Sequence, residues 1–134
     1  MDNKFWLAVA AAFVTSFVLS FISHGIILAG DYNALLGVYR GPQLGASLFA
    51  LLLLAQLIMA AAMAAIYRYG REEQPFLGQG VRFGLLAAGL SVIPCYLIGY
   101  VVTNIPAFLA IKQIVFETIK VVAMSVAVAW VYSR

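Results

Sequence analysis

The stretch LFALLLLAQLIMAAAMAAIY, residues 48–67, carries no charged side chain and a single amide, Gln56. A bilayer core of about 30 Å is crossed by about 20 apolar residues in an α-helix. The four consecutive leucines at 51–54 lack the alternation of apolar and polar residues that a membrane β-strand requires. We therefore interpret this stretch as the centre of a transmembrane helix.

Three further apolar runs have a similar length, so the sequence predicts an all-α fold, a four-transmembrane-helix bundle that forms one integral membrane domain over residues 1–134. The predicted spans cover about residues 5–28, 44–67, 81–102 and 107–132. The first run is longer than the apolar part of a signal peptide and no small-x-small cleavage site follows it, so we expect an uncleaved span. The short connection at 103–106 predicts that the last two helices are antiparallel neighbours.

The composition indicates that lipid surrounds most of the chain, and it argues against a nucleic-acid surface and a structural zinc site. Hydrophobic residues make up 65% of the chain and charged residues 10%, whereas soluble domains carry about 25% charged residues. The net charge of +3 comes from scattered basic residues, which does not indicate a nucleic-acid surface. With one cysteine and one histidine, the chain lacks the ligands of a structural zinc site. We expect no metal and no cofactor.

The basic residues predict the orientation, because cytoplasmic loops are enriched in lysine and arginine. The side that holds both termini would carry Lys4, Arg68, Arg71, Arg82 and Arg134. The opposite side would carry Arg40 and Lys112. We therefore expect a multi-pass protein of the bacterial inner membrane with both termini in the cytoplasm. The expected aromatic belt at the cytoplasmic interface consists of Trp6, Tyr67, Tyr69, Trp130 and Tyr132.

The last span contains an intramembrane polar cluster on one helical face, where Gln113, Glu117 and Lys120 follow one another at intervals of four and three residues. A charge at the centre of a span costs at least about 2.5 kcal/mol, so such residues normally face the bundle interior. We expect Gln113 to bond to Glu117, and Gln56 with the first-span serines to face the same cluster. Two interpretations remain open: a functional one, as a proton or ion relay or as a counter-charge for a substrate, and a structural one, as an ion pair that fixes helix packing or partner choice.

A second candidate site lies on the outer side and consists of His24, Asp31 and Arg40. Contacts between His24 and Asp31, or between Asp31 and Arg40, would order the outer connection. His24 is a candidate pH sensor or metal ligand. An isolated histidine is more often simply hydrogen-bonded, which is the alternative.

The third span has features of tight packing and of a bend. Gly80, Gly84 and Ala88 recur every four residues and predict a small-residue packing face, with a partner inside or outside the chain. Pro94 predicts a kink in this helix. Cys95 beside it is expected to be a small buried apolar residue.

Three short motifs resemble those of a group of small bacterial four-span membrane proteins with no assigned function. They are the HGIILAGDY stretch at 24–32, the Tyr39–Arg40 pair, and GQGVRFGLL at 78–86, followed by a single glutamate in the fourth span. The resemblance implies the four-span fold and no particular activity. Small multidrug transporters are different, because their essential glutamate lies in the first span, where this chain has no acidic residue.

The chain has no phosphate-binding loop, nucleophile elbow or paired acidic motif, so we expect that it is not an enzyme. The first functional hypothesis is an accessory or structural subunit of an inner-membrane complex, or a homo-oligomer, with lipid and other membrane subunits or further copies as partners. The alternative is a transporter or channel for a small solute or ion, proton-coupled, that uses the Glu117–Lys120 pair.

Overall fold

The computed structural model describes residues 2–40 and 45–134, and these residues fold into helices joined by short connections. The elements in chain order are α1 (Asn3–Ser20), the π-helix η1 (Phe21–Ile27), α2 (Ala29–Asn33), α3 (Ala46–Gly70), α4 (Phe76–Leu90), α5 (Val92–Val102) and α6 (Ala107–Tyr132). Four helical stretches are long and apolar enough to cross a membrane: Asn3–Ile27, Ala46–Gly70, Phe76–Val102 and Ala107–Tyr132. The predicted all-helical class with four such helices is confirmed at this level.

The third helical stretch begins at Phe76, earlier than the predicted residue 81. The reason is the side chain of Gln79, which orders the preceding connection. Its amide accepts from the backbone N–H of Glu72 at 2.9 Å and donates to the Glu72 carbonyl at 2.8 Å. Gln79 is only 2% exposed, and both hydrogen bonds of its buried amide are made to Glu72. The helix can therefore begin before this polar residue.

The third stretch is also broken into two helices at Ser91, whose φ of −117° and ψ of −81° are not helical. Pro94, the third residue of α5, explains the break, because a proline has no N–H for the carbonyl four residues earlier and its ring clashes with that carbonyl. The expected bend therefore falls three residues before Pro94. Cys95 is exposed, so its expected burial was wrong: it lies on an outer face of α5.

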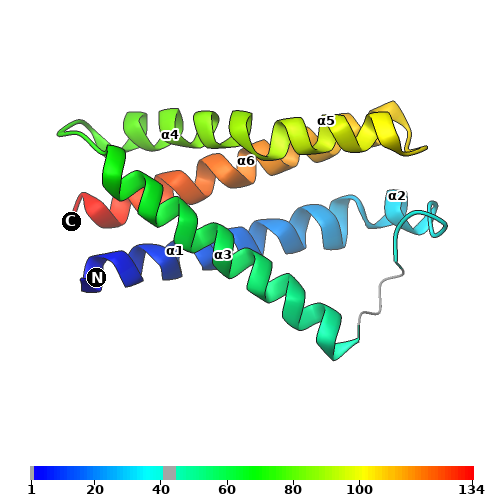
Figure 1. Ribbon diagram of the computed structural model, residues 1–134, viewed down its shortest axis with the longest axis horizontal. Helices are drawn as coiled ribbons and strands as arrows, with labels where there is room; N and C mark the ends of the chain where they lie inside the picture. Colours follow the sequence, from blue (N-terminus) through cyan, green and yellow to red (C-terminus); the bar gives the residue numbers. More distant parts are fainter. Residues whose placement is uncertain (1, 41–44) are drawn as a thin grey trace.

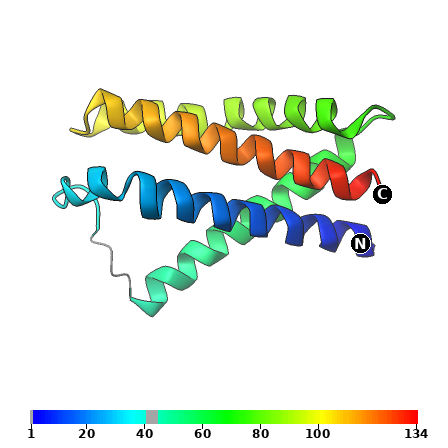
Figure 2. The ribbon, with the colours of Figure 1, turned by 180° about the vertical axis from the view of Figure 1, so that it is seen from behind.

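Helix α6 is the central element and packs against α1, α3, α4 and α5. Figure 2 shows α6 between α1 on one side and the α4–α5 pair on the other. The glycines of α4 allow the closest approach: a Cβ added to Gly84 would lie 2.5 Å from the Cα of Val122, and one added to Gly80 would lie 2.8 Å from the Cα of Val126. The predicted small-residue face thus contacts α6 of the same chain, and Ala88 is fully buried beside it.

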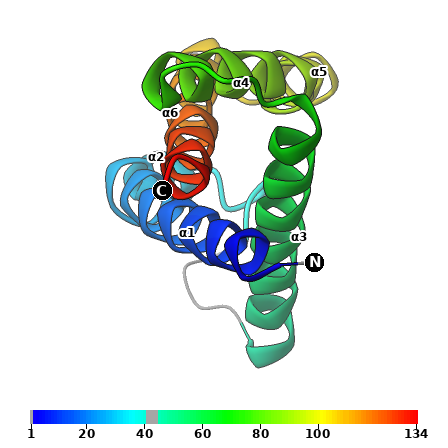
Figure 3. The ribbon, with the colours of Figure 1, turned by 90° about the vertical axis from the view of Figure 1, so that its left-hand side faces the viewer.

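Helix α3 is the oblique element of the bundle. It begins at Ala46, far from α5, and ends at Gly70 beside the start of α4, at the end of the bundle that holds both chain termini (Figure 1). In the view along the bundle (Figure 3), α3 lies on one side and α6 on the other, and the start of α1 approaches α3, against which α1 packs. Its buried residues all lie in its second part, from Gln56 onward. They are Gln56, Ala60, Met63, Ala64 and Tyr67.

The apolar core fills the half of the bundle that contains the termini. Its members come from α1, α3, α4 and α6, with Val92 from the start of α5, and include Val9, Ala12, Met63, Met124 and Val128. A smaller cluster of Leu28, Ile105, Leu109 and Ala110 lies at the opposite end.

The expected aromatic belt needs correction for two of its members. Trp6, Tyr69 and Trp130 are exposed, but Tyr67 and Tyr132 are 3% and 8% exposed. Their rings stack on each other at a centroid distance of 5.8 Å, because both helices turn this face towards the core.

Candidate functional site

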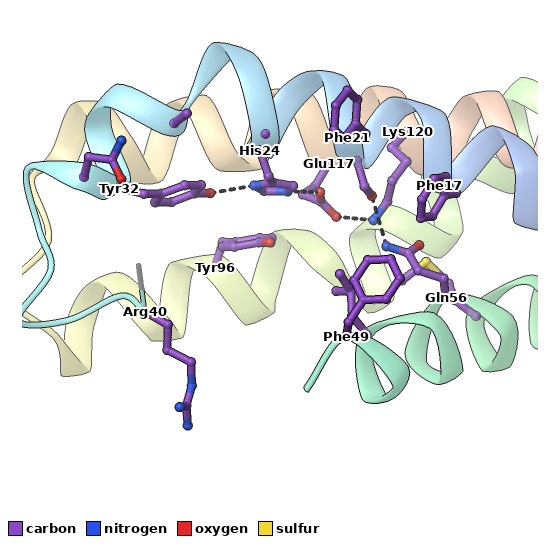
Figure 4. Close-up of a pocket in the computed structure, with 16 residues that line it drawn as sticks. Phe17, Phe21, His24, Tyr32, Arg40, Phe49, Gln56, Tyr96, Glu117 and Lys120 are labelled. Atoms are coloured by element: carbon purple, nitrogen blue, oxygen red, sulfur yellow. Dashed lines mark hydrogen bonds and ion pairs between the residues drawn. The ribbon is translucent and has the colours of Figure 1, made fainter. Parts of the chain in front are cut away.

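A continuous chain of polar contacts joins η1, α2 and α6. The Tyr32 hydroxyl lies 2.6 Å from Nδ1 of His24, and Nε2 of His24 lies 2.6 Å from Oε1 of Glu117. The second carboxylate oxygen of Glu117 accepts from Nζ of Lys120 at 2.7 Å. Figure 4 shows these four side chains in a row. Glu117 therefore has a basic partner on each oxygen.

This row can hold a proton in more than one place. With one proton on its ring, His24 donates from Nε2 to Glu117 and accepts the Tyr32 hydroxyl proton at Nδ1. With two protons, both ring nitrogens donate and the histidine becomes a charged partner of the carboxylate. The side chains of Glu117 and Lys120 are 4% exposed, so a change of charge here is felt without much screening by solvent.

The amide of Gln56 forms a second polar group that links α3 to α1. It accepts from the Ser16 hydroxyl and donates from Nε2 to the Ser20 hydroxyl at 3.2 Å. Gln56 is 7% exposed and Ser16 is fully buried. Ser23, the third serine of this face, instead donates to the Leu19 carbonyl of its own helix at 2.8 Å.

Gln113 does not bond to Glu117 as expected. Its Nε2 donates to the hydroxyls of Tyr32 at 3.3 Å and Tyr39 at 3.1 Å, and the two tyrosine rings lie 4.7 Å apart. The polar end of each tyrosine thereby finds a partner on α6 while its ring packs on the small apolar cluster. Gln113 thus attaches the connection between η1 and α3 to α6 and positions Tyr32 for His24.

The outer-side residues separate in the structure. Asp31 pairs with Lys112 at 3.1 Å, so neither of its expected contacts, with His24 or with Arg40, forms. His24 turns instead towards Glu117 of α6. Arg40 is exposed, and in Figure 4 its side chain points away from the row of polar contacts. Of the outer-side candidate residues, His24 therefore joins Glu117 and Lys120 in one row, whereas Asp31 and Arg40 lie outside it.

The backbone around His24 is unusual. Phe21–Ile27 form a π-helix, in which the Leu28 N–H reaches the Ser23 carbonyl five residues earlier at 2.8 Å. Such segments are rare and are found preferentially at functional sites. The wider turn lies directly at His24, where α1 leaves its α-helical geometry.

The row borders a cavity of about 1040 Å³. This volume lies just above the range of small-molecule sites, roughly 300–1,000 Å³. Polar lining residues include His24, Gln56, Glu117 and Lys120, and apolar ones include Phe17, Phe21, Phe49, Leu52, Met59 and Tyr96. The cavity therefore combines a broad apolar wall with a small set of converging polar groups, which is typical of ligand sites.

On the side of the termini the cavity ends at the apolar core. Beyond Lys120, the next buried residues of α6 are Val121 and Met124, which pack with Val9, Ala12 and Met63. Over residues 2–40 and 45–134 no three His, Cys, Asp or Glu side chains form a group that could hold a metal ion. The arrangement suits solute binding and proton exchange from one end of the bundle.

No protein-family model, no curated protein and no solved structure matches this chain. The resemblance to small four-span proteins consequently rests on its short motifs alone. Two of these motif residues, His24 and Tyr32, belong to the polar row.

Two features of the site were missed by sequence reasoning. The roles of Tyr32 and Tyr39 depend on a connection that folds back onto α6, and only the presence of hydroxyl-bearing rings beside a polar residue hinted at them. Tyr96 lines the cavity from α5 and looked like one more apolar residue of the span.

Proposed function

We propose that this chain is an integral protein of the bacterial inner membrane, with four spans and both termini in the cytoplasm. The excess of basic residues at the terminal side supports this orientation. The two termini also lie at the same end of the bundle (Figure 1), as expected for an even number of spans. In this frame the cavity is accessible from the outer half of the membrane, and the apolar core closes the cytoplasmic half.

Within this membrane frame we propose a proton-coupled carrier for a small solute. The observation that carries the proposal is the row of Tyr32, His24, Glu117 and Lys120 along the wall of the cavity. Glu117 and Lys120 are the eleventh and fourteenth of the 26 residues of α6, so they lie near mid-membrane. Ionisable residues at this depth normally mark solute pathways and proton relays.

The coupling follows from shared groups. A proton that binds to Glu117 removes the charge that pairs with Lys120, and so changes the electrostatics of the cavity wall. A solute that contacts the same wall changes the proton affinity of Glu117, because coupling between two binding events is reciprocal. The packed core between Lys120 and the termini favours a carrier over a channel, since among the described residues it is formed by apolar side chains, with Ser125 as a single buried polar residue of α6 beside it.

The test measures proton flux in liposomes that contain the purified protein and an internal pH-sensitive dye. With a negative-inside potassium diffusion potential, we expect proton entry above that of protein-free liposomes. Glu117→Gln should reduce this entry to background, while the matched exchange Glu73→Gln in the exposed connection after α3 should keep the wild-type rate. Glu117→Asp, which keeps the carboxylate, controls for folding and should retain part of the flux. Equal flux in wild type and Glu117→Gln would refute the carrier.

A non-enzymatic accessory subunit, or a homo-oligomer, is the second proposal. The observation in its favour is α5, in which only Val92 of 11 residues is buried. Its exposed residues include Leu97, Ile98, Val101 and Val102. A helix of a partner protein could cover this apolar face in place of lipid. Affinity purification in mild detergent tests it: a stoichiometric larger partner supports the subunit, and the chain alone, as a monomer, refutes it.

A further inference from the structure

The cavity opens along the side of the bundle. Helix α3 packs on α1 and α6, and α5 packs on α4 and α6, but α3 and α5 diverge towards the end opposite the termini (Figure 1). Phe49 and Leu52 of α3 and Tyr96 of α5 line the cavity on the two sides of this opening. If the helices span the membrane as proposed above, the opening faces lipid and not bulk water.

The cavity lining has an apolar part and a polar part, which match the two parts of an amphiphilic molecule. Leu52 and Phe49, at 43% and 44% exposed, form an apolar rim on the α3 side. The deep wall carries Gln56, Glu117 and Lys120, which are at most 7% exposed. A molecule that enters from the bilayer can keep its hydrocarbon at the rim while its polar group reaches the deep wall.

The charges around the cavity favour an anionic polar group. Its charged lining residues are Arg40 and Lys120 against Glu117, with His24 as a further proton acceptor. Glu117 is already paired with Lys120, and Asp31, the other acidic residue of this end, is paired with Lys112. In the part of the chain that the structure describes, Arg40 has no ion-pair partner. An arginine guanidinium offers a fork of donors that matches a phosphate group.

We propose that the ligand of this cavity is a membrane lipid with an anionic phosphate head group, which enters sideways between α3 and α5. This inference rests on the membrane insertion of the proposed function and gives its solute a chemical class. The head group contacts Arg40 at the outer mouth and the polar wall at its deep end, and the acyl chains lie between α3 and α5.

Lipid binding is tested by native mass spectrometry of the full chain released from detergent. The probes are phosphatidylglycerol, phosphatidylcholine with the same acyl chains, and glycerol phosphate as the free head group. We expect phosphatidylglycerol to bind at least tenfold more tightly than phosphatidylcholine, and glycerol phosphate not to bind. Equal binding of the two lipids would overturn the anionic head group, and binding of glycerol phosphate would overturn the lipid as the source.

Two arginine variants locate the site. Arg40→Gln should reduce phosphatidylglycerol binding to the level of phosphatidylcholine, whereas Arg82→Gln, an exposed arginine on α4, should leave it unchanged. A photoreactive group on an acyl chain should label α3 and α5 of the wild type, which tests the entry side without any substitution. Undiminished binding by Arg40→Gln, or labelling confined to other helices, would overturn the site.

The same preparations separate the two proposals. Proton flux that depends on Glu117, without selective lipid binding, would support the carrier and refute the lipid as its ligand. Selective lipid binding without such flux would support the lipid site and refute the carrier.

Discussion

The two halves of the bundle are built on different principles. In the half that holds the termini, α1, α3, α4 and α6 meet through small residues, and several of these, such as Ala8, Ala12, Ala60, Ala64 and Ala88, are fully buried. In the opposite half, α3 diverges from the other helices, and a cavity of about 1040 Å³ lies beside a small apolar cluster. One half is closed by an apolar core, and the other holds a cavity with polar side chains on its deep wall.

The difference can be followed along α3. Its first part has large side chains, among them the four leucines at 51–54. Leu51 is 59% exposed and Leu54 is 50% exposed. Its second part has alanines at 60–62, 64 and 65, which allow α1 to approach closely. Gln56 lies at the change and ties the two helices through Ser16 and Ser20. The size of the side chains thus determines where the bundle closes and where it opens.

The largest effect is expected from Glu117→Gln in the open half. It leaves the buried ammonium group of Lys120 without its carboxylate, and breaking a buried ion pair in this way costs about 3 kcal/mol of stability. The measurement is thermal unfolding in detergent, with the double variant Glu117→Gln, Lys120→Met beside it. We expect the double variant to recover most of the loss, since both charges are then absent. A double variant that is less stable than Glu117→Gln would contradict the ion pair as the cause.

The next effect tests the closed half through Gly84→Leu. A side chain at Gly84 meets the backbone of Val122, which cannot turn away as a side chain can, so α4 must move off α6. Overpacking of this kind costs about 2 kcal/mol. The control is Gly89→Leu on the same helix, where an added Cβ meets nothing within 4 Å and should change the unfolding temperature little. Similar losses in both variants would remove close packing as the explanation.

The comparison also separates what the sequence predicts from what it does not. Length and hydropathy are local properties, so four long apolar helices and the span at 107–132 followed directly from them. The sequence predicted the small-residue face of α4. It did not predict the partner, because a row of small residues can pack against any helix and the contact with α6 depends on the fold. The same holds for Gln113, whose partners Tyr32 and Tyr39 lie more than 70 residues away.

Two backbone irregularities illustrate the limit further. Proline acts on the carbonyl four residues earlier, so Pro94 produces a break at Ser91 and not at its own position. The π-helix at Phe21–Ile27 has no residue pattern of its own in this chain. It became visible only from the bond between the Leu28 N–H and the Ser23 carbonyl, and its residues Phe21, His24 and Gly25 line the cavity.

A smaller effect is expected at the junction of the two halves from Gln56→Leu. Hydrogen bonds between helices in membranes contribute about 0.6 kcal/mol on average, so the loss of the contacts to Ser16 and Ser20 should cost about 1 kcal/mol. A double-mutant cycle with Ser16→Ala measures the coupling between the two side chains in the same unfolding experiment. Additive effects of the two substitutions would show that this contact does not hold α3 to α1.

The smallest effect concerns Tyr32 at the outer end, and it depends on pH. Burial raises the pKa of Tyr32 from 10.0 to about 12, and the negative charges of Asp31 and Glu117 add to this, while the Gln113 amide lowers it. The folded state therefore favours the neutral phenol. Its contribution to stability is complete below about pH 10 and is lost as the pH rises towards about 12. Because Tyr32 is partly exposed, we expect a loss of no more than about 1 kcal/mol.

The measurement compares wild type with Tyr32→Phe, which keeps the ring but has no proton to lose. The difference between their absorbance titrations at the tyrosinate band should give a midpoint near pH 12 for Tyr32. The unfolding temperature of the wild type should fall more steeply than that of Tyr32→Phe between pH 10 and 12. If Tyr32 titrates near 10 in the folded protein, the hydroxyl is not held between His24 and Gln113. The row that lines the cavity would then begin at His24, and the open half would be more accessible to water than its contacts indicate.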